Sequence, residues 1–217
     1  MNNTAADAIK DLYPYRHNVT ITGRIHNFGA GPAVLPLEVV EECRKSLPNL
    51  NNSGFGLLEI SHRSKTFQNI VDSSMEKLRR ILSIPEDYTV LYLQGGASLQ
   101  FYMSALNLLR ENEKVDFLVT GVWSQKALKE ASRIGDASAR WDDSENGFRS
   151  IPSNEDYSVR DDSLYLHYTS NNTLFGTQFH HLPESNGKPR VLDASSDIMG
   201  VPLDVSSHDL IYAGAQK

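Results

Sequence analysis

The chain has 217 residues, of which 40% are hydrophobic and 22% are charged, and this composition is ordinary for a globular protein that can bury a full core. Its 21 basic and 27 acidic residues give a net charge of −6, which argues against a nucleic-acid-binding surface. No apolar run approaches the roughly 18 residues of a membrane span, and a lone cysteine, Cys43, fits a reducing compartment, so we expect a cytoplasmic protein without a membrane segment.

Helix-like and strand-like patterns alternate along the chain. Val39, Val40, Cys43 and Leu47 recur at helical spacing, which predicts a helix that buries the cysteine. Further helices are predicted, in chain order, at residues 70–82, 98–110 and 124–133. Short β-branched and aromatic runs predict strands at 89–93, 117–120, 137–141, 163–168, 190–193 and 210–213, with a polar loop at 142–160.

This alternation indicates an α/β fold with a mainly parallel sheet flanked by helices. Sheets of this kind bind ligands beyond the carboxyl ends of their strands. The polar and glycine residues that stand out in the sequence follow predicted strands, so we expect them to gather at that edge.

A glycine turn follows the strand predicted at 89–93. Gly95, Gly96 and Ala97 let the backbone approach an anion closely, and Ser98 opens a helix whose first N–H groups point toward it. The turn predicts a phosphate site, although a nucleotide, a cofactor phosphate and a plain tight turn all fit it. Neither the dinucleotide glycine pattern nor the lysine-bearing nucleotide loop is present.

Asp193 and Lys217 each follow a predicted strand. Pyridoxal 5′-phosphate enzymes need this pair of residues, because the carboxylate keeps the pyridine nitrogen protonated and the amine binds the cofactor aldehyde as a Schiff base. Taken alone, the two residues are more typical of a turn aspartate and a solvated surface lysine.

Trp123 and Thr173 also follow strands. The tryptophan is either a core residue or a platform for a flat heteroaromatic ring, and the threonine either contacts the phenolic oxygen of such a ring or caps a turn.

Several motifs in the same order give the sequence a specific resemblance. They are NFGAGPA at 27–33, EISHRSK at 59–65, QGGASLQ at 94–100, SNNT at 170–173 and IYAGAQK at 211–217. Through them the chain resembles the phosphoserine aminotransferases, fold-type I, class V enzymes that depend on pyridoxal 5′-phosphate. The resemblance covers residues 27–217, and Gly29 departs from it because serine is expected there.

The resemblance implies a role for each matching residue. Lys217 would bind the cofactor covalently and act as catalytic nucleophile and base, Asp193 would pair with the ring nitrogen, and Trp123 would stack on the ring. The other implied contacts are Thr173 near the phenolic oxygen and Ala97, Ser98 and Gln216 at the phosphate. His62 and Arg63 would bind the phosphate of the substrate, and their chemistry agrees, because the Arg63 guanidinium offers a bidentate fork beside a second donor. Without the flanking motif, a solvated entry to a helix near Ser61 is the alternative for that pair.

The implied reaction is a ping-pong transamination. L-Glutamate would give its amino group to the cofactor and leave as 2-oxoglutarate, and 3-phosphohydroxypyruvate would then become O-phospho-L-serine, a step of serine biosynthesis. The resemblance also implies a homodimer with active sites at the subunit interface.

The same resemblance implies a domain organisation. Residues 1–33 would form an amino-terminal extension and arm, and residues 34–217 an aspartate-aminotransferase-like large domain that is incomplete at its carboxyl end. A strand between 89–93 and 210–213 and a carboxyl-terminal small domain would be absent, so we expect the 217-residue chain alone to be inactive.

Two other readings stay open. One is a truncated, non-catalytic chain with a partial cofactor site. The other is a different class V enzyme, such as a cysteine desulfurase, although such an enzyme would stack a histidine on the ring where this chain has Trp123.

Overall fold

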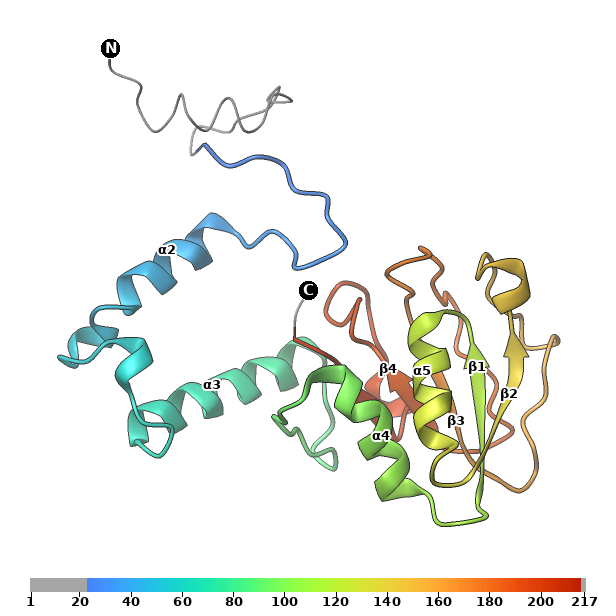
Figure 1. Cartoon of the computed structure of the whole chain (residues 1–217). Coiled ribbons are helices and arrows are strands. Elements are labelled where there is room, and N and C mark those ends of the chain that lie inside the picture. The colour runs from blue at the N-terminus through green and yellow to red at the C-terminus, as the bar shows by residue number, and fades with distance from the viewer. Residues whose placement is uncertain (1–22, 216–217) are drawn as a thin grey trace.

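The computed structural model describes residues 23–215. Its α-helices are α2 (Leu37–Ser46), α3 (Lys65–Ile81), α4 (Gly96–Leu108) and α5 (Val122–Ala131). Its strands are β1 (Lys114–Val119), β2 (Asp136–Asp142), β3 (Ser163–Thr169), β4 (Arg190–Asp193) and β5 (Leu210–Tyr212). Short 3₁₀ turns lie at Leu50–Asn52, Leu57–Glu59, Ser144–Asn146 and Val205–Ser207. Figure 1 shows that α2 and α3 stand apart from the sheet.

The five strands form one sheet in the order β2-β1-β3-β4-β5, and every neighbouring pair is parallel. The α/β prediction with a parallel sheet is therefore confirmed. Thr169 of β3 lies beside Asp193 of β4, which in turn lies beside Tyr212 of β5. Because all strands run the same way, their carboxyl ends meet along one edge, where ligands bind in such folds.

The core lies on both faces of the sheet. Side chains alternate along each strand, so Phe117 and Val119 face α4 and α5, whereas Leu118 faces the opposite side. Figure 1 shows α4 and α5 side by side against the sheet. On the helical face they contribute the buried residues Phe101, Ala105, Ala127 and Ala131. Strand residues and loop residues such as Val159 and Phe179 fill the second cluster.

Two predictions of local structure are wrong. Residues 89–93 form no strand, because within the described chain no strand lies beside them or beyond β5 to supply hydrogen bonds. Their side chains Leu91, Tyr92 and Leu93 are accordingly exposed. Cys43 does lie on a helix, as predicted, but it is exposed, since α2 buries none of its residues against the rest of the described chain.

A buried ion pair ties the segment before β3 to the centre of the sheet. Asp116 of β1 is fully buried, and its two carboxylate oxygens accept hydrogen bonds from Arg160 N and Nε, each at 2.7 Å. Arg160 also bonds the backbone carbonyls of Val115 and Asp136. Without the guanidinium, the carboxylate would remain as an uncompensated buried charge.

We therefore expect Arg160→Ala to lower the free energy of unfolding by about 3 kcal/mol or more. Arg133→Ala is the matched control, because Arg133 holds Glu130 at the same 2.7 Å but on the surface, where such a pair contributes at most about 1 kcal/mol. Urea unfolding of both purified variants measures the difference. Equal losses for both variants would show that the Arg160 pair does not stabilise the fold through burial.

Candidate active site

The ends of three strands and the start of α4 come together at the carboxyl edge of the sheet. Gly214, just past β5, lies against the first turn of α4, since a Cβ atom built on it would be 3.6 Å from Ala97 Cβ. The Gly214 N–H donates to Ser195 Oγ at 3.0 Å, and Ser195 follows the end of β4. The predicted phosphate turn and the predicted ring-nitrogen partner, Asp193, are therefore neighbours in space.

Asp193 is a nearly fully buried carboxylate, with 2% of its surface exposed. Its Oδ1 accepts hydrogen bonds from Ser195 N at 3.0 Å and Ser195 Oγ at 2.6 Å. Burial raises the pKa of Asp193, the two bonds from Ser195 oppose that rise, and the negative charge of Asp197 adds to it. In the described part of the chain, no lysine or arginine pairs with Asp193.

The glycine turn has the backbone geometry of an anion site. Gly95 has a φ of 91° and Gly96 a φ of 61°, both in the left-handed region that glycine adopts readily. A side chain at Gly95 would also collide with Leu99, whose Cδ2 would be 2.4 Å from the added Cβ. α4 begins at this turn and runs for 13 residues, so its free N–H groups and its dipole favour an anion there. Ala97 is half-buried and Ser98 is exposed.

Trp123 lies in the first turn of α5 and is partly buried against the core. Lys126 Nζ lies 4.5 Å from the centroid of its ring, a cation–π contact. Trp123 thus packs against the hydrophobic core. Its stacking on a cofactor ring stays a prediction.

The loop that carries Thr173 is fixed to the end of β1 by Asn172. Asn172 Nδ2 donates to Thr120 Oγ1 at 3.0 Å and to Thr177 Oγ1 at 3.1 Å. Gly121 makes this possible, because a Cβ there would lie 2.3 Å from Asn172 Oδ1. Thr173 itself is half-buried beside this anchor. Sequence reasoning missed the role of Asn172: the SNNT motif at 170–173 singled out the segment, but not the contact of Asn172 with Thr120.

His62 and Arg63 are not brought to the other site residues. Both are exposed and precede α3, whose amino-terminal end is the end farther from the sheet in Figure 1. Within residues 23–215, no hydrogen bond or ion pair joins either side chain to the glycine turn or to Asp193. Gln216 and Lys217 lie outside the described residues, so their predicted roles stay predictions.

The site fits a small ligand that carries a cation and a phosphate. Asp193 offers a buried negative charge that lacks a cationic partner in residues 23–215, and the glycine turn beside it suits an anion. Thr169, in register with Asp193, has a buried hydroxyl without a hydrogen-bond partner, and such an orphaned group is expected where a ligand or water completes the bonding. Pyridoxal 5′-phosphate, with its ring nitrogen and phosphate, has this chemistry.

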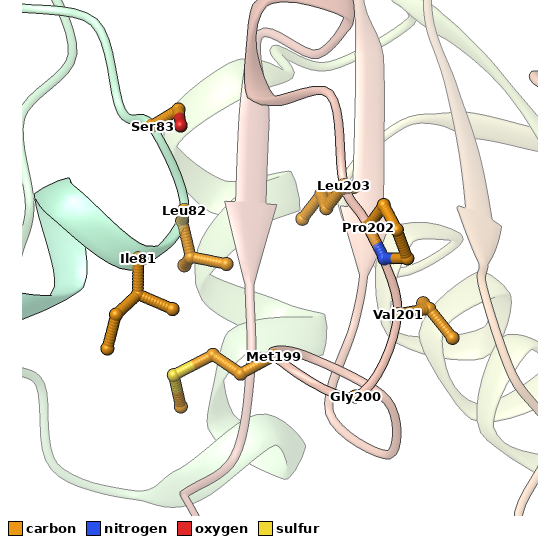
Figure 2. A pocket seen from close by; sticks show the side chains of 8 residues that line it. All are labelled: Ile81, Leu82, Ser83, Met199, Gly200, Val201, Pro202 and Leu203. Carbon is orange, nitrogen blue, oxygen red and sulfur yellow. The ribbon is translucent and has the colours of Figure 1, made fainter.

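Two surface clefts lie elsewhere. One, of about 380 Å³, separates the end of α3 from the loop at 199–203 (Figure 2). Its lining, which includes Ile81, Leu82, Met199 and Leu203, holds no titratable side chain. The other, of about 580 Å³, lies near Arg160 and Asn186, before β3 and β4 begin, and so at the opposite edge of the sheet. Neither contains the predicted site residues.

Residues 23–215 hold no cluster of three or more potential metal ligands among histidine, cysteine, aspartate and glutamate. They also hold no helix with the length and apolar character needed to cross a bilayer.

Comparison with known proteins agrees with this geometry. The family model "Aminotransferase class-V" matches residues 25–217. Phosphoserine aminotransferases of Desulfotalea psychrophila and Halalkalibacterium halodurans are 46% and 47% identical over 194 residues, which are 89% of this chain and 54% of each relative. The chain also matches the phosphoserine aminotransferase structure from Bacillus circulans subsp. alkalophilus with a TM-score of 0.84 and 38% identity, over 88% of this chain and 53% of that one.

A second solved structure, pyridoxal-phosphate-bound phosphoserine aminotransferase from Trichomonas vaginalis, matches with a TM-score of 0.79 and 32% identity, over 88% of this chain and 53% of that one. The chain belongs to the class-V aminotransferase family. It spans about half the length of the curated relatives that it matches. The resemblance inferred from its motifs is confirmed.

The raised pKa of Asp193 predicts how stability depends on pH. Aspartates of the unfolded chain have a pKa of about 3.9, and the folded protein binds the proton of the Asp193 carboxyl more tightly than that. The contribution of Asp193 to the free energy of unfolding therefore falls as the pH rises through both pKa values, and it stays reduced above them. Asp197 and the buried Tyr212 phenol are the titratable neighbours.

We expect Asp193→Asn to make the cofactor-free protein more stable than wild type at pH 7, with a gain that shrinks as the pH falls from the raised pKa of folded Asp193 to the unfolded value of about 3.9. Denaturant unfolding over a pH series, on protein of native length, measures this. Asp204→Asn is the control, since exposed Asp204 accepts the same pair of bonds from Ser206. A neutral-pH loss of stability in Asp193→Asn, or a gain independent of pH, would contradict the assignment of a buried charge.

Proposed function

We propose that this chain forms the cofactor-binding part of a phosphoserine aminotransferase, an enzyme that uses pyridoxal 5′-phosphate. One observation carries the proposal: the buried Asp193 carboxylate, without a cationic partner in residues 23–215, lies beside a glycine turn suited to phosphate. The similarity to phosphoserine aminotransferases over 89% of the chain supports the same function.

Each residue has a defined task toward the cofactor. Asp193 would hold the ring nitrogen protonated, and Trp123 would stack on the ring. Ala97 and Ser98 would bind the phosphate through the start of α4. Thr173 would contact the phenolic oxygen, and Gln216 would add a phosphate contact.

Lys217 would hold the cofactor covalently and move a proton at the substrate α-carbon. When bound, the cofactor supplies an electron sink for the negative charge that develops at that carbon. Asp193 makes this sink effective, because a carboxylate stabilises the positive charge of a protonated ring. Burial strengthens that interaction by excluding water from the pair.

The substrates of the proposed reaction are L-glutamate and 3-phosphohydroxypyruvate, and its products are 2-oxoglutarate and O-phospho-L-serine. His62 and Arg63 would bind the substrate phosphate, Arg63 through its guanidinium fork. Their separation from Asp193 means that a rearrangement, a further segment or a second subunit must complete the site. A homodimer would provide the second subunit. The exposed apolar residues of α2 and α3, such as Val39 and Ile70, are available for contacts between subunits.

We also propose a domain organisation for the chain and a cytoplasmic location for the protein. Residues 1–33 would act as an arm, and residues 34–217 as the large cofactor-binding domain. The lone Cys43 fits the reducing cytoplasm.

Covalent labelling tests the assignment of Lys217. Borohydride reduction of the protein with bound pyridoxal 5′-phosphate should fix the cofactor on Lys217, and peptide mass spectrometry locates the label. Lys126, which lies over Trp123, and Lys65, at the start of α3, are the internal comparisons. Recovery of the label mainly on either of them would rule out the assignment.

A change at Arg63 tests substrate recognition. We expect Arg63→Ala to slow the half-reaction with O-phospho-L-serine by roughly tenfold or more, because a charge-assisted phosphate contact is lost. The half-reaction with L-glutamate should change much less. Single-turnover absorbance measurements follow each separately, and equal losses would assign Arg63 to the fold or to the carboxylate that both substrates share.

A further inference from the structure

The hydroxyl of Ser195 connects two strand ends inside the candidate site. Ser195 Oγ donates to Asp193 Oδ1 at 2.6 Å, at the end of β4, and accepts from Gly214 N at 3.0 Å, just past β5. Gly214 lies three residues before Lys217 and against Ala97 of the glycine turn. One hydroxyl therefore contacts the residue proposed for the ring nitrogen and the segment that leads to the proposed nucleophile.

The bonds from Ser195 also orient the Asp193 carboxylate. Both the backbone N–H and the hydroxyl of Ser195 donate to the same oxygen, Oδ1. No hydrogen bond to Asp193 Oδ2 arises from residues 23–215. The carboxylate is thus held by one oxygen, and the other stays available to a ligand. Hydrogen bonds to the ionised form also favour the charged state against the cost of burial.

We propose that Ser195 is a positioning residue for the cofactor, acting through Asp193: it orients the carboxylate toward the ring nitrogen and fixes the Gly214 segment beside it. The proposal rests on the proposed function, since it names a further residue of the same site. It adds Ser195 to the residues that the sequence motifs single out.

A second aspartate–serine pair in the chain provides a matched control. Ser206 donates to Asp204 Oδ1 through its N at 3.1 Å and its Oγ at 2.6 Å, nearly the same geometry as Ser195 and Asp193. Both residues are exposed, and the pair lies at the start of a 3₁₀ turn. Ser206→Ala therefore removes the same type of bond where no cofactor contact is proposed.

Titration of the native-length protein with pyridoxal 5′-phosphate, followed by absorbance and tryptophan fluorescence, tests the proposal. We expect Ser195→Ala to raise the Kd by about tenfold, the loss expected for a hydrogen bond to a charged group. Ser195→Thr, which keeps the hydroxyl, should bind within about threefold of wild type. Ser206→Ala should bind like wild type.

A double-mutant cycle separates positioning from a general structural role. In an Asp193→Asn background, Ser195→Ala should lose most of its effect on the Kd, because the group through which it acts has been neutralised. In cofactor-free protein, the Gly214 amide should exchange its hydrogen faster in Ser195→Ala than in Ser206→Ala.

The possible results discriminate clearly. An unchanged Kd in Ser195→Ala, or the same loss in both Asp193 backgrounds, would overturn the positioning role and leave the proposed function standing. If wild-type protein bound no pyridoxal 5′-phosphate, the proposed function would fail, and the positioning role with it.

Discussion

Asp193 places a carboxylate inside the protein at the end of β4, where burial disfavours its negative charge. A buried charge persists when it is hydrogen-bonded and paired, and here the described residues supply only the first condition, through Ser195. The second condition is open to a cationic ligand. A protonated pyridine ring meets it, so the carboxylate whose charge is disfavoured in the ligand-free fold is the group that the proposed chemistry needs.

The parallel sheet brings the rest of the site to that carboxylate. Thr169, Asp193 and Tyr212 lie in register on adjacent strands, so the loops that follow them emerge at one edge. Gly214 then packs on Ala97, which joins the start of α4 to the same place. On the other side, Gly121 leaves room for Asn172, which holds the Thr173 loop against β1. The site is thus assembled by backbone packing before any ligand contributes.

Much of this arrangement could be predicted from the sequence, because strand patterns and glycine turns are local signals. The five strands that pair in the sheet were expected close to their observed positions, and α4 follows the glycine turn as expected. The errors arise where structure depends on a partner. Residues 89–93 have a strand-like sequence, but a strand needs a hydrogen-bonded neighbour. Cys43 sits on a helix with a plausible apolar face, but burial needs a surface to pack against.

Ser195 and Asn172 could not be singled out in the same way. Each acts through a contact that sequence spacing does not reveal, Ser195 with Gly214 and Asn172 with Thr120. Asp193-Ala194-Ser195 and Asp204-Val205-Ser206 show the same local pattern, and only burial and the tertiary contact separate the first from the second. Residues that position a catalytic group are recognised once the fold shows what they touch.

The role proposed for Asp193 is to stabilise a positive charge on the cofactor ring. Nitrogen-15 NMR of ring-labelled pyridoxal 5′-phosphate bound to native-length protein measures that charge directly. At neutral pH, the ring nitrogen should show the shift of a protonated pyridine in wild-type protein and of an unprotonated one in Asp193→Asn. The same unprotonated shift in both proteins, or the same protonated shift in both, would contradict the role assigned to Asp193.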